Sequence, residues 1–426
     1  MIPALVCASC GQRLPHDSPR VQCECGGLLD AIPTLGDEVS GRKLRERFDA
    51  RLRQPERHRA GDSGVWRYAE LVLSGPGVIV SHPEGNTPLH RRDALSRYVG
   101  LEDFTLKHEG QNPTGSFKDR GMTVAVSRAV RVGATAVACA STGNTSASMA
   151  AYAAQAGLPA LVFVPRGKVA AGKLAQALAY GARTLLVRGD FDACLRLARE
   201  SVDKLGVTLL NSVNPWRIEG QKTIVLEMLQ QLRWDPPDWI VVPAGNLGNM
   251  AAFGKALVEA RKLRLISRVP RLAAIQATGA NPFYRSYRAG FRRRYRVKAE
   301  TVATAIRIGD PASFDRAVRA IRQTGGAVAA VSDSEILEAK AAVDATGIGC
   351  EPASAAAVAG TRRLVREGRI RRGESVVAVL TGHLLKDPQA VLDFHGRRAR
   401  GANPPREIAP RLAEVEKVLG ELSRAR

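Results

Sequence analysis

The chain has 426 residues, of which 45% are hydrophobic and 24% charged, which is typical of a globular protein and excludes disordered and fibrous classes. The net charge of +22 suits a nucleic-acid binder, a protein of membrane surfaces or an enzyme for anionic substrates, so charge alone selects no function. No apolar run is long enough to span a bilayer and no secretory leader is evident, so we expect a cytoplasmic protein with reduced thiols.

Residues 1–36 form a separate module that contains the cysteine pairs "CASC" at 7–10 and "CEC" at 23–25. In a reducing compartment such a cluster fits a structural zinc site better than disulfides. The Cys-x-Cys pair is tighter than the usual second pair of a zinc ribbon, so free thiols stay open as the alternative. The candidate metal ligands are Cys7, Cys10, Cys23 and Cys25.

A charged helix is predicted at 41–53, and beyond it short apolar runs alternate with amphipathic helices. This alternation predicts an α/β architecture with mostly parallel sheets, whose strands are buried on both faces. A linker rich in Pro, Gly and Arg and one short helix end the chain. Strands are expected at 135–141, 160–165, 183–189, 208–212, 239–244, 271–278 and 375–382. Helices are expected between them at 173–182, 191–206 and 218–232. The three remaining cysteines, Cys139, Cys194 and Cys350, fall in apolar segments and are expected in the core.

The stretch "GQNPTGSFKDRGM" at 110–122 places one lysine, Lys118, where a Gly/Ser/Thr turn meets an apolar helix. A lysine in the first turn opposes the positive end of the helix dipole, and Gly115 lets the backbone approach another group closely. A surface lysine is the ordinary interpretation. A reactive amine that burial keeps uncharged is the sharper one, and the other loops favour it.

The loop "STGNTSAS" at 141–148 joins a predicted strand to a predicted helix. Hydroxyl, amide and backbone N–H donors at a helix N-terminus suit an anion such as a carboxylate, although a simple helix cap is the alternative. Its candidate binding residues are Ser141, Thr142, Asn144 and Thr145.

Two other features suggest functions that the residues do not support. The stretch "GKVAAGKL" at 167–174 follows a strand and matches part of a nucleotide P-loop, but Leu174 stands where magnesium needs Ser or Thr, and residues 169–171 look helical. The basic segment at 287–298 is expected to be a solvated surface loop. Aromatic residues make up only 5% of the chain, too few for a base-stacking platform.

The loop "VVPAGNLGNM" at 241–250 follows another strand and leads into a helix. Its two glycines allow successive N–H groups to turn inward, which suits a phosphate. The loop "TGHLLKD" at 381–387 ends the last strand, and the hydroxyl of Thr381 can meet a ring heteroatom, with simple capping as the alternative. The candidate phosphate-binding residues are Gly245, Asn246, Leu247, Gly248 and Asn249.

Together these loops match one ligand, pyridoxal phosphate. The cofactor needs an amine for its aldehyde, a nest for its phosphate, a donor for its phenolic oxygen and a partner for its ring nitrogen. Lys118, the loop at 245–249, Asn144 and Thr381 supply these in turn. A hydroxyl beside the ring nitrogen leaves that nitrogen unprotonated, which favours elimination over transamination.

A series of motifs between about residues 80 and 390 resembles the threonine synthase family in sequence and order. The motifs are "EGNTPL", "NPTGSFKDRGM", "ASTGNTSAS", "NSVNPWRIEGQK", "PAGNLGN", "ETVATAIRIGDPASF", "CEPASAA" and "TGHLLKD". The resemblance implies the type II pyridoxal-phosphate fold, which is tryptophan synthase β-like, with the cofactor between two α/β domains. Leu384 stands where the family usually has glycine, which bears on the packing of its loop and not on Thr381. The expected parts are the module 1–36, the large domain 41–121 and 206–395, the small domain 122–205, and the tail 396–426.

The resemblance also implies a lyase that converts O-phospho-L-homoserine and water to L-threonine and phosphate, the last step of threonine biosynthesis. Lys118 is then the Schiff-base and proton-transfer lysine. The substrate brings a second phosphate, for which Arg217 is the expected partner, with Asn211 and Ser212 as neighbouring donors. A helix-start arginine on the surface is the alternative interpretation of Arg217.

Cysteate synthase, which acts on phosphoserine and sulfite, also resembles threonine synthase. Cysteate synthesis is therefore the alternative reaction. A basic zinc-ribbon protein that binds nucleic acid on a retired enzyme fold is the alternative from another class, and the intact lysine and anion loops argue against it. We expect a homodimer with a small-molecule substrate that binds neither nucleic acid nor membrane.

Overall fold

The computed structural model describes residues 4–18, 20–32, 40–53, 62–73, 75, 77–167, 171–396 and 402–424. The chain divides into two units, residues 1–387 and residues 388–426. In the described ranges, no helix has both the length and the apolar composition needed to cross a membrane.

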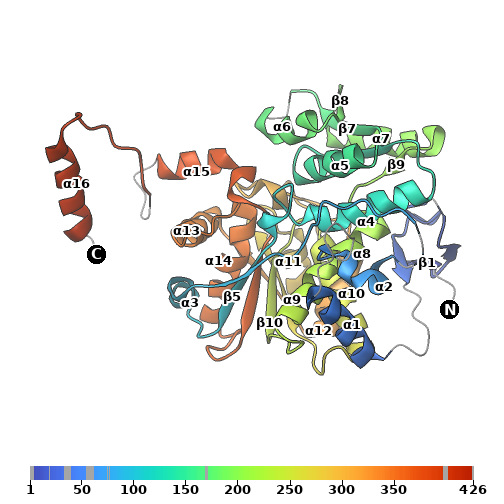
Figure 1. The fold of residues 1–426 in the computed structure, drawn as a ribbon, viewed down its shortest axis with the longest axis horizontal. Coiled ribbons are helices and arrows are strands. Elements are labelled where there is room, and N and C mark those ends of the chain that lie inside the picture. Colours follow the sequence, from blue (N-terminus) through green and yellow to red (C-terminus); the bar gives the residue numbers. More distant parts are fainter. Residues whose placement is uncertain are drawn as a thin grey trace. The chain divides into compact units, whose positions relative to one another are not determined.

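The largest sheet of the first unit has six strands in the order β12-β11-β10-β13-β5-β4 (Figure 1). They are parallel, except that β4 pairs antiparallel with β5. Ile240 and Val242 of β10 join one hydrophobic cluster, whereas Trp239 and Val241 join another. Because alternate residues of a strand point to opposite faces, the sheet is buried on both faces, as predicted. Its strands are β4 (Leu89–Arg91), β5 (Phe104–His108), β10 (Trp239–Pro243), β11 (Arg271–Ala277), β12 (Ala327–Val331) and β13 (Val376–Leu380).

A second sheet has four parallel strands in the order β8-β7-β6-β9 and lies in the upper part of Figure 1. The prediction that every strand is buried on both faces is wrong for β8. This strand lies at the edge, where less of the fold covers it, and Leu186 is 59% exposed. The strands are β6 (Val137–Ala140), β7 (Ala160–Pro165), β8 (Arg183–Val187) and β9 (Thr208–Leu209).

The N-terminal module contains a small antiparallel sheet in the order β2-β1-β3. Cys7 ends β1, Cys10 lies in the connection to β2, and Cys23 and Cys25 lie in the connection from β2 to β3. The strands are β1 (Ala4–Cys7), β2 (Arg13–Pro15) and β3 (Leu29–Ile32).

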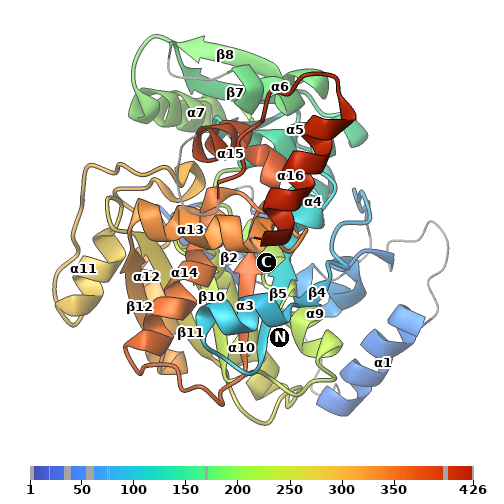
Figure 2. The same cartoon turned by 90° about the vertical axis from the view of Figure 1, so that its left-hand side faces the viewer.

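Helices cover the two larger sheets, and local capping explains where several begin and end. The α13 helix begins with a capping box formed by Ser332 and Glu335. The α7 helix begins at Asp190, whose side chain accepts from the N–H of Ala193, and it ends at Gly206 with a φ of 68°. The α14 helix packs on β10, β11, β12 and β13 (Figure 2). The helices of this unit are α1 (Gly41–Arg53), α2 (Ala69–Val72), α3 (Asp93–Val99), α4 (Lys118–Arg131), α5 (Asn144–Gln155), α6 (Ala171–Ala179), α7 (Phe191–Leu205), α8 (Pro215–Gln221), α9 (Thr223–Gln231), α10 (Gly248–Lys262), α11 (Pro282–Arg288), α12 (Phe314–Thr324), α13 (Asp333–Asp344) and α14 (Pro352–Arg366).

The structure has two helices, α8 and α9, where one continuous helix was predicted at 218–232, so the prediction of a single helix was wrong. The hydroxyl of Thr223 donates to the carbonyl of Gly220 at 2.7 Å and competes there with the helical ladder. At the same point α8 meets α4 closely, because a Cβ on Gly220 would lie 1.8 Å from the carbonyl oxygen of Arg120.

The second unit contains α15 (Pro388–His395) and α16 (Leu412–Arg424), the latter as predicted from its amphipathic pattern. Within this unit Arg406 forms an ion pair with Glu421. Residues 397–401 of the predicted linker lie outside the described residues. So do residues 168–170, on which part of the P-loop interpretation depended.

The predicted boundary between a large and a small domain stays a prediction. The four-stranded sheet contains the strands from 137 to 209, and the six-stranded sheet contains those from 89 to 108 and those after 238.

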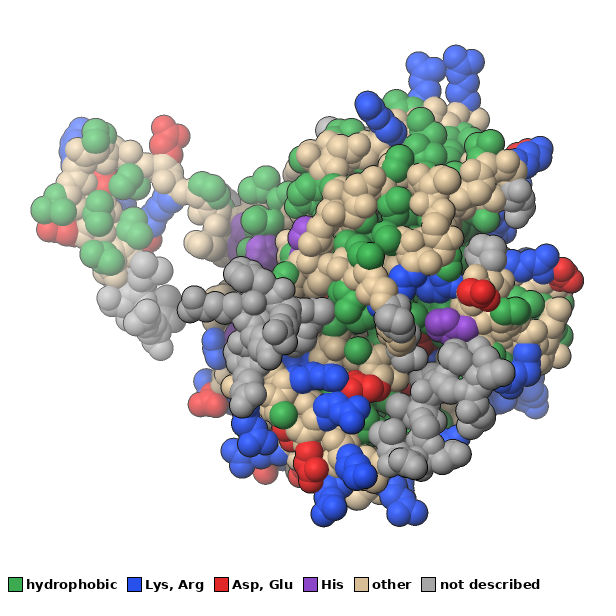
Figure 3. Space-filling view, turned by 45° about the vertical axis from the view of Figure 1, so that its right-hand side comes forward, with side chains coloured by type: hydrophobic (Ala, Val, Ile, Leu, Met, Phe, Trp, Pro, Cys, Tyr) green, Lys and Arg blue, Asp and Glu red, His purple; other side chains and the backbone are tan. Residues whose placement is uncertain are grey.

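Basic side chains are distributed over the surface. Figure 3 shows Lys and Arg scattered over one face and not gathered into a stripe. In the basic segment, Arg292, Arg293, Arg294 and Arg296 are exposed, as expected of a surface loop.

Candidate active site

The predicted loops follow the carboxyl ends of parallel strands in both sheets. Loops 141–145 and 211–212 follow β6 and β9, and loops 245–249 and 381–387 follow β10 and β13. Such ends are where ligands bind in open α/β sheets. Lys118 is the first residue of α4, reached from β5 through the short helix η3 (Glu109–Gln111).

The turn before Lys118 is fastened to the loop after β13. The N–H of Phe117 donates to the carbonyl of Thr381 at 3.0 Å, and the N–H of His383 donates to the carbonyl of Gly115 at 2.9 Å. Gly115 has a φ of +82°, and a Cβ there would press on the side chain of Lys386 at 3.0 Å. The structure therefore brings the predicted lysine and the predicted ring-nitrogen residue onto paired segments.

Lys118 lies in surroundings that favour a neutral amine. Its Nζ lies 4.1 Å from the centre of the Phe117 ring. Burial, and next the charge of Arg217, lower the pKa of Lys118 to about 7, against the opposing effect of Glu351. A neutral amine at physiological pH can act as nucleophile and base.

Asp119 holds the turn against α5. Its carboxylate accepts from the N–H and hydroxyl of Thr114 at 2.7 and 2.6 Å, and from the hydroxyl of Ser148 at 2.6 Å. Burial raises its pKa to about 6, although these hydrogen bonds oppose the shift. No role was predicted for Asp119, although it directly follows Lys118 in the quoted motif.

Asn144 and Thr381 meet at one carboxylate, that of Glu351. The amide of Asn144 donates to Glu351 Oε2 at 3.2 Å, and the hydroxyl of Thr381 donates to Oε1 at 3.4 Å. Thr381 Oγ1 also lies 3.1 Å from Ser354 Oγ. Burial raises the pKa of Glu351. Sequence reasoning missed Glu351, and its only signal was the motif "CEPASAA" that contains it.

The loop at 245–249 has the backbone of an anion nest. Leu247 has a φ of 63° immediately before α10, so a left-handed residue is followed by helical N–H groups. A Cβ on Gly245 would lie 2.9 Å from the Cα of Ile306, so the loop also needs glycine for packing.

Asn246 and Ser212 link this loop to the one after β9. The amide of Asn246 donates to Ser212 Oγ at 3.0 Å, and its Oδ1 accepts from the N–H of Ala312 at 3.0 Å. Asn246 thus shapes the loop through its side chain. The side-chain oxygen of Asn249 is buried and has no hydrogen-bond partner among the described residues.

Arg217 is a buried cation whose hydrogen-bonding capacity is largely unused. It is 1% exposed, and its Nη1 donates to the carbonyl of Leu210 at 3.2 Å. Its Nε and Nη2 have no partner among the described residues. Burial lowers its pKa to about 10. A buried guanidinium without a carboxylate is costly, so this geometry fits an anionic ligand.

The other predicted binding residues differ in whether their side chains already have hydrogen-bond partners in the protein. Asn211 is engaged with the end of β6, since it accepts from the N–H of Ala140 and donates to its carbonyl, both at 3.0 Å. Ser141 accepts from the N–H of Gly143 at 3.3 Å. Thr142 and Thr145 lie half-buried beside Asn144 at the start of α5. Leu384 begins the short helix η5 (Leu384–Lys386) and lies against Gly349, so its loop accepts a side chain where the family usually has glycine.

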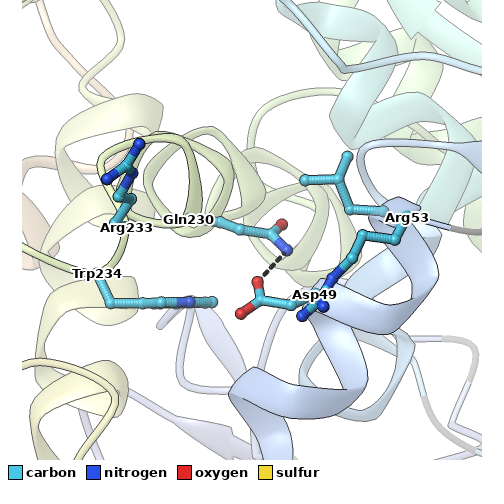
Figure 4. A pocket seen from close by; sticks show the side chains of 6 residues that line it. Asp49, Arg53, Gln230, Arg233 and Trp234 are labelled. Atoms are coloured by element: carbon cyan, nitrogen blue, oxygen red, sulfur yellow. Dashed lines mark hydrogen bonds between the residues drawn. The ribbon is translucent and has the colours of Figure 1, made fainter.

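A groove elsewhere is not part of this constellation. It lies between α1 and the end of α9, where the amide of Gln230 donates to Asp49 at 2.8 Å (Figure 4). Arg53, Arg233 and Trp234 also line it, and it contains none of the predicted site residues.

Comparison with known proteins agrees with this geometry. The model of the pyridoxal-phosphate dependent enzyme family matches residues 80–382, and the chain therefore belongs to that family. The threonine synthase of Methanocaldococcus jannaschii is 44% identical over 98% of this chain and 99% of its own. That of Methanosarcina acetivorans is 46% identical over 91% and 93%. The resemblance to threonine synthases is thereby confirmed. The solved structure of threonine synthase from Escherichia coli has the same fold, with a TM-score of 0.71 at 19% identity over 96% of this chain and 94% of that chain.

Proposed function

We propose that the enzyme converts O-phospho-L-homoserine and water to L-threonine and phosphate. The observation that carries the proposal is Arg217, a buried and mostly unpartnered guanidinium, in a chain whose Lys118 has a lowered pKa. The names of the near-full-length relatives support the same reaction.

The residues of the site fit pyridoxal phosphate. The nest at 245–249 would hold its phosphate, Asn144 its phenolic oxygen and Thr381 its ring nitrogen. Lys118 would bind its aldehyde carbon. When bound, the cofactor supplies an electron sink for carbanion chemistry. Glu351 lies between Asn144 and Thr381 and would position both side chains.

Lys118 would then move protons on the substrate. A neutral amine can take the proton from Cα and later from Cβ, which leads to loss of phosphate from Cγ and addition of water at Cβ. Arg217 would bind the substrate phosphate through the nitrogens that have no protein partner, with Ser212 nearby. The donors at 141–145 would bind the substrate carboxylate at the start of α5.

We further propose that the protein is a cytoplasmic homodimer that binds no nucleic acid. Its small domain would comprise residues 122–205, and its large domain would comprise residues 41–121 and 206–395. The scattered basic side chains support steering of an anionic substrate over binding along a nucleic acid.

A product assay tests the reaction. The cofactor-loaded enzyme is incubated with O-phospho-L-homoserine, and released phosphate and threonine are both quantified. Equal amounts of the two products are expected. Phosphoserine with sulfite is the parallel reaction. Faster phosphate release from that pair, with cysteate as product, would replace the proposed reaction by cysteate synthesis.

A further inference from the structure

The four N-terminal cysteines converge on one point. All four sulfurs lie within 4.8 Å of one another. The Cys7–Cys25, Cys10–Cys25 and Cys10–Cys23 sulfur pairs are 3.5, 3.4 and 3.7 Å apart. Sulfurs about 2.3 Å from a tetrahedral zinc ion stand about 3.8 Å apart, whereas a disulfide needs about 2 Å. The spacing is that of ligands around an ion.

The surrounding backbone is built for thiolates. The N–H groups of Ser9 and Cys10 point at the sulfur of Cys7, at 3.4 and 3.5 Å. A Cβ on Gly27 would lie 2.5 Å from the same sulfur, so only glycine fits there. Gly11 and Gly26 have φ values of 76° and 81°, which close the two turns that present the cysteines.

The module is too small to be stable through its own core. It consists of three short strands within residues 4–32, and segments of this size normally need a metal, a disulfide or a partner surface. The cysteines form no disulfide. Four sulfur ligands with no open position are typical of a structural zinc site.

The module rests on the helices that carry the candidate active site. The His16 ring packs edge-on against Trp216 of α8 at 4.8 Å, and the carbonyl of His16 accepts from Arg128 of α4 at 2.8 Å. Lys255 of α10 donates to the carbonyl of Ala31 at 2.6 Å. Arg316 of α12 pairs with Asp30 at 2.8 Å. Three of these helices begin with, or contain, Lys118, Arg217 and the end of the anion nest.

We propose that Cys7, Cys10, Cys23 and Cys25 bind one structural Zn²⁺, and that the metal-locked module braces α8 behind Arg217 through the contact of His16 with Trp216. The ion takes no part in the reaction. The ion acts on structure alone, because it stabilises the surface against which the seven-residue helix α8 packs.

Metal analysis of the full-length protein tests the site. One zinc per chain is expected, and replacement by Co²⁺ should give the absorption of a tetrahedral thiolate site, measured as a difference from the zinc form. Cys10→Ser with Cys25→Ser, at two exposed positions, should abolish both signals, whereas Cys194→Ala, at a buried cysteine outside the module, should keep them. Protein free of metal after growth with zinc, or a double variant that keeps the metal, would overturn the site.

Hydrogen exchange tests the brace. Amides of α8 should exchange several-fold faster after zinc removal by a chelator, and also in His16→Ala, which keeps the metal. Amides of β12, an edge strand of the six-stranded sheet, serve as the internal control. If zinc removal accelerates exchange throughout the chain, the His16→Ala variant, which keeps the metal, provides the test of the brace. Unchanged exchange of α8 in that variant would refute the brace, and neither measurement depends on the proposed reaction.

Discussion

Two groups of basic side chains each include one residue of α4, and they differ in their partners. In the first group, Arg120 pairs with Glu109 at 2.7 Å and with Glu227 at 2.8 Å, and Lys107 pairs with Glu227 at 2.6 Å. Burial works to raise the pKa of Glu227, but Arg120 and Lys107 lower it overall. Every charge in this cluster has an opposite charge beside it.

In the second group, Lys118 and Arg217 have no such carboxylate within bonding distance among the described residues, and burial lowers the pKa of both. Lys118 and Arg120 are only two residues apart, so their helix and composition do not explain the difference. The paired charges are satisfied within the fold, whereas the unpaired basic groups are the ones that we propose to bind a ligand.

The largest expected effect is on turnover in Lys118→Ala. We expect a loss of about 10³-fold or more, because the amine proposed to move the substrate protons is gone. The visible absorption band of the bound cofactor should also disappear while the circular dichroism stays native. Lys298→Ala, at an exposed lysine, should behave like wild type. Retention of the band and of turnover in Lys118→Ala would assign the chemistry to another residue.

Breaking the paired cluster of Lys107, Arg120 and Glu227 should lower the stability of the protein. Glu227→Ala leaves Arg120 and Lys107 buried beside an empty position, so we expect a loss of about 3–5 kcal/mol in the free energy of unfolding. Denaturant titration measures it. Glu46→Ala removes the same side chain from an exposed pair with Arg42 and should cost under about 0.5 kcal/mol. Equal losses in the two variants would contradict the structural role of the cluster.

Removing the charge of Arg217 should weaken substrate binding and should not lower the stability of the protein. Arg217→Met fills the same space without charge, so O-phospho-L-homoserine should bind about 2–4 kcal/mol more weakly. The free energy of unfolding should stay unchanged or rise, because a costly buried charge is removed. Arg217→Lys keeps the charge but loses the planar fork, and it should recover only part of the affinity. Titration calorimetry provides the comparison, and wild-type affinity in Arg217→Met would refute the role of Arg217.

The smallest effect concerns pH. A lowered pKa means that Lys118 releases its proton at a lower pH than an ordinary lysine, so its neutral form is present above about 7. The rate at which cofactor-free protein captures pyridoxal phosphate should reach half of its maximum near pH 7 and level off above that pH. In Arg217→Met the profile should move to higher pH, because the neighbouring positive charge no longer disfavours the protonated amine. A profile that keeps rising toward pH 10 would contradict the lowered pKa.

Apolar patterning predicted the architecture well where burial follows the period of a strand or helix. The seven predicted strands exist, in a six-stranded sheet that is parallel except for β4 and in a four-stranded parallel sheet. The strands β5 and β12 were missed for particular reasons. The β5 strand contains Lys107 and His108, both buried, and β12 is rich in alanine, which favours helices over strands.

The residue types of the site were also readable from the sequence. A lysine after a Gly/Ser/Thr turn, a glycine-containing loop and a threonine at a strand end each follow local rules of backbone and charge. Glu351 and Asp119 were missed because a carboxylate has no local mark that distinguishes a site residue from a surface one. Their positions depend on contacts with Asn144 and Ser148, far away in the sequence.

By itself the sequence determined the α/β class, the glycine-containing and hydroxyl-rich loops at strand ends, the position of Lys118 after a Gly/Ser/Thr turn and the four-cysteine cluster. These follow from periodicity, spacing and residue type, which act over a few residues. Only the tertiary structure decided which buried charges are paired. Arg120 finds its carboxylates on η3 and α9, whereas Arg217 has no carboxylate partner among the described residues. Pairing depends on distances of a few ångströms between distant segments, because charge interactions weaken with separation and burial removes the solvent that would screen them.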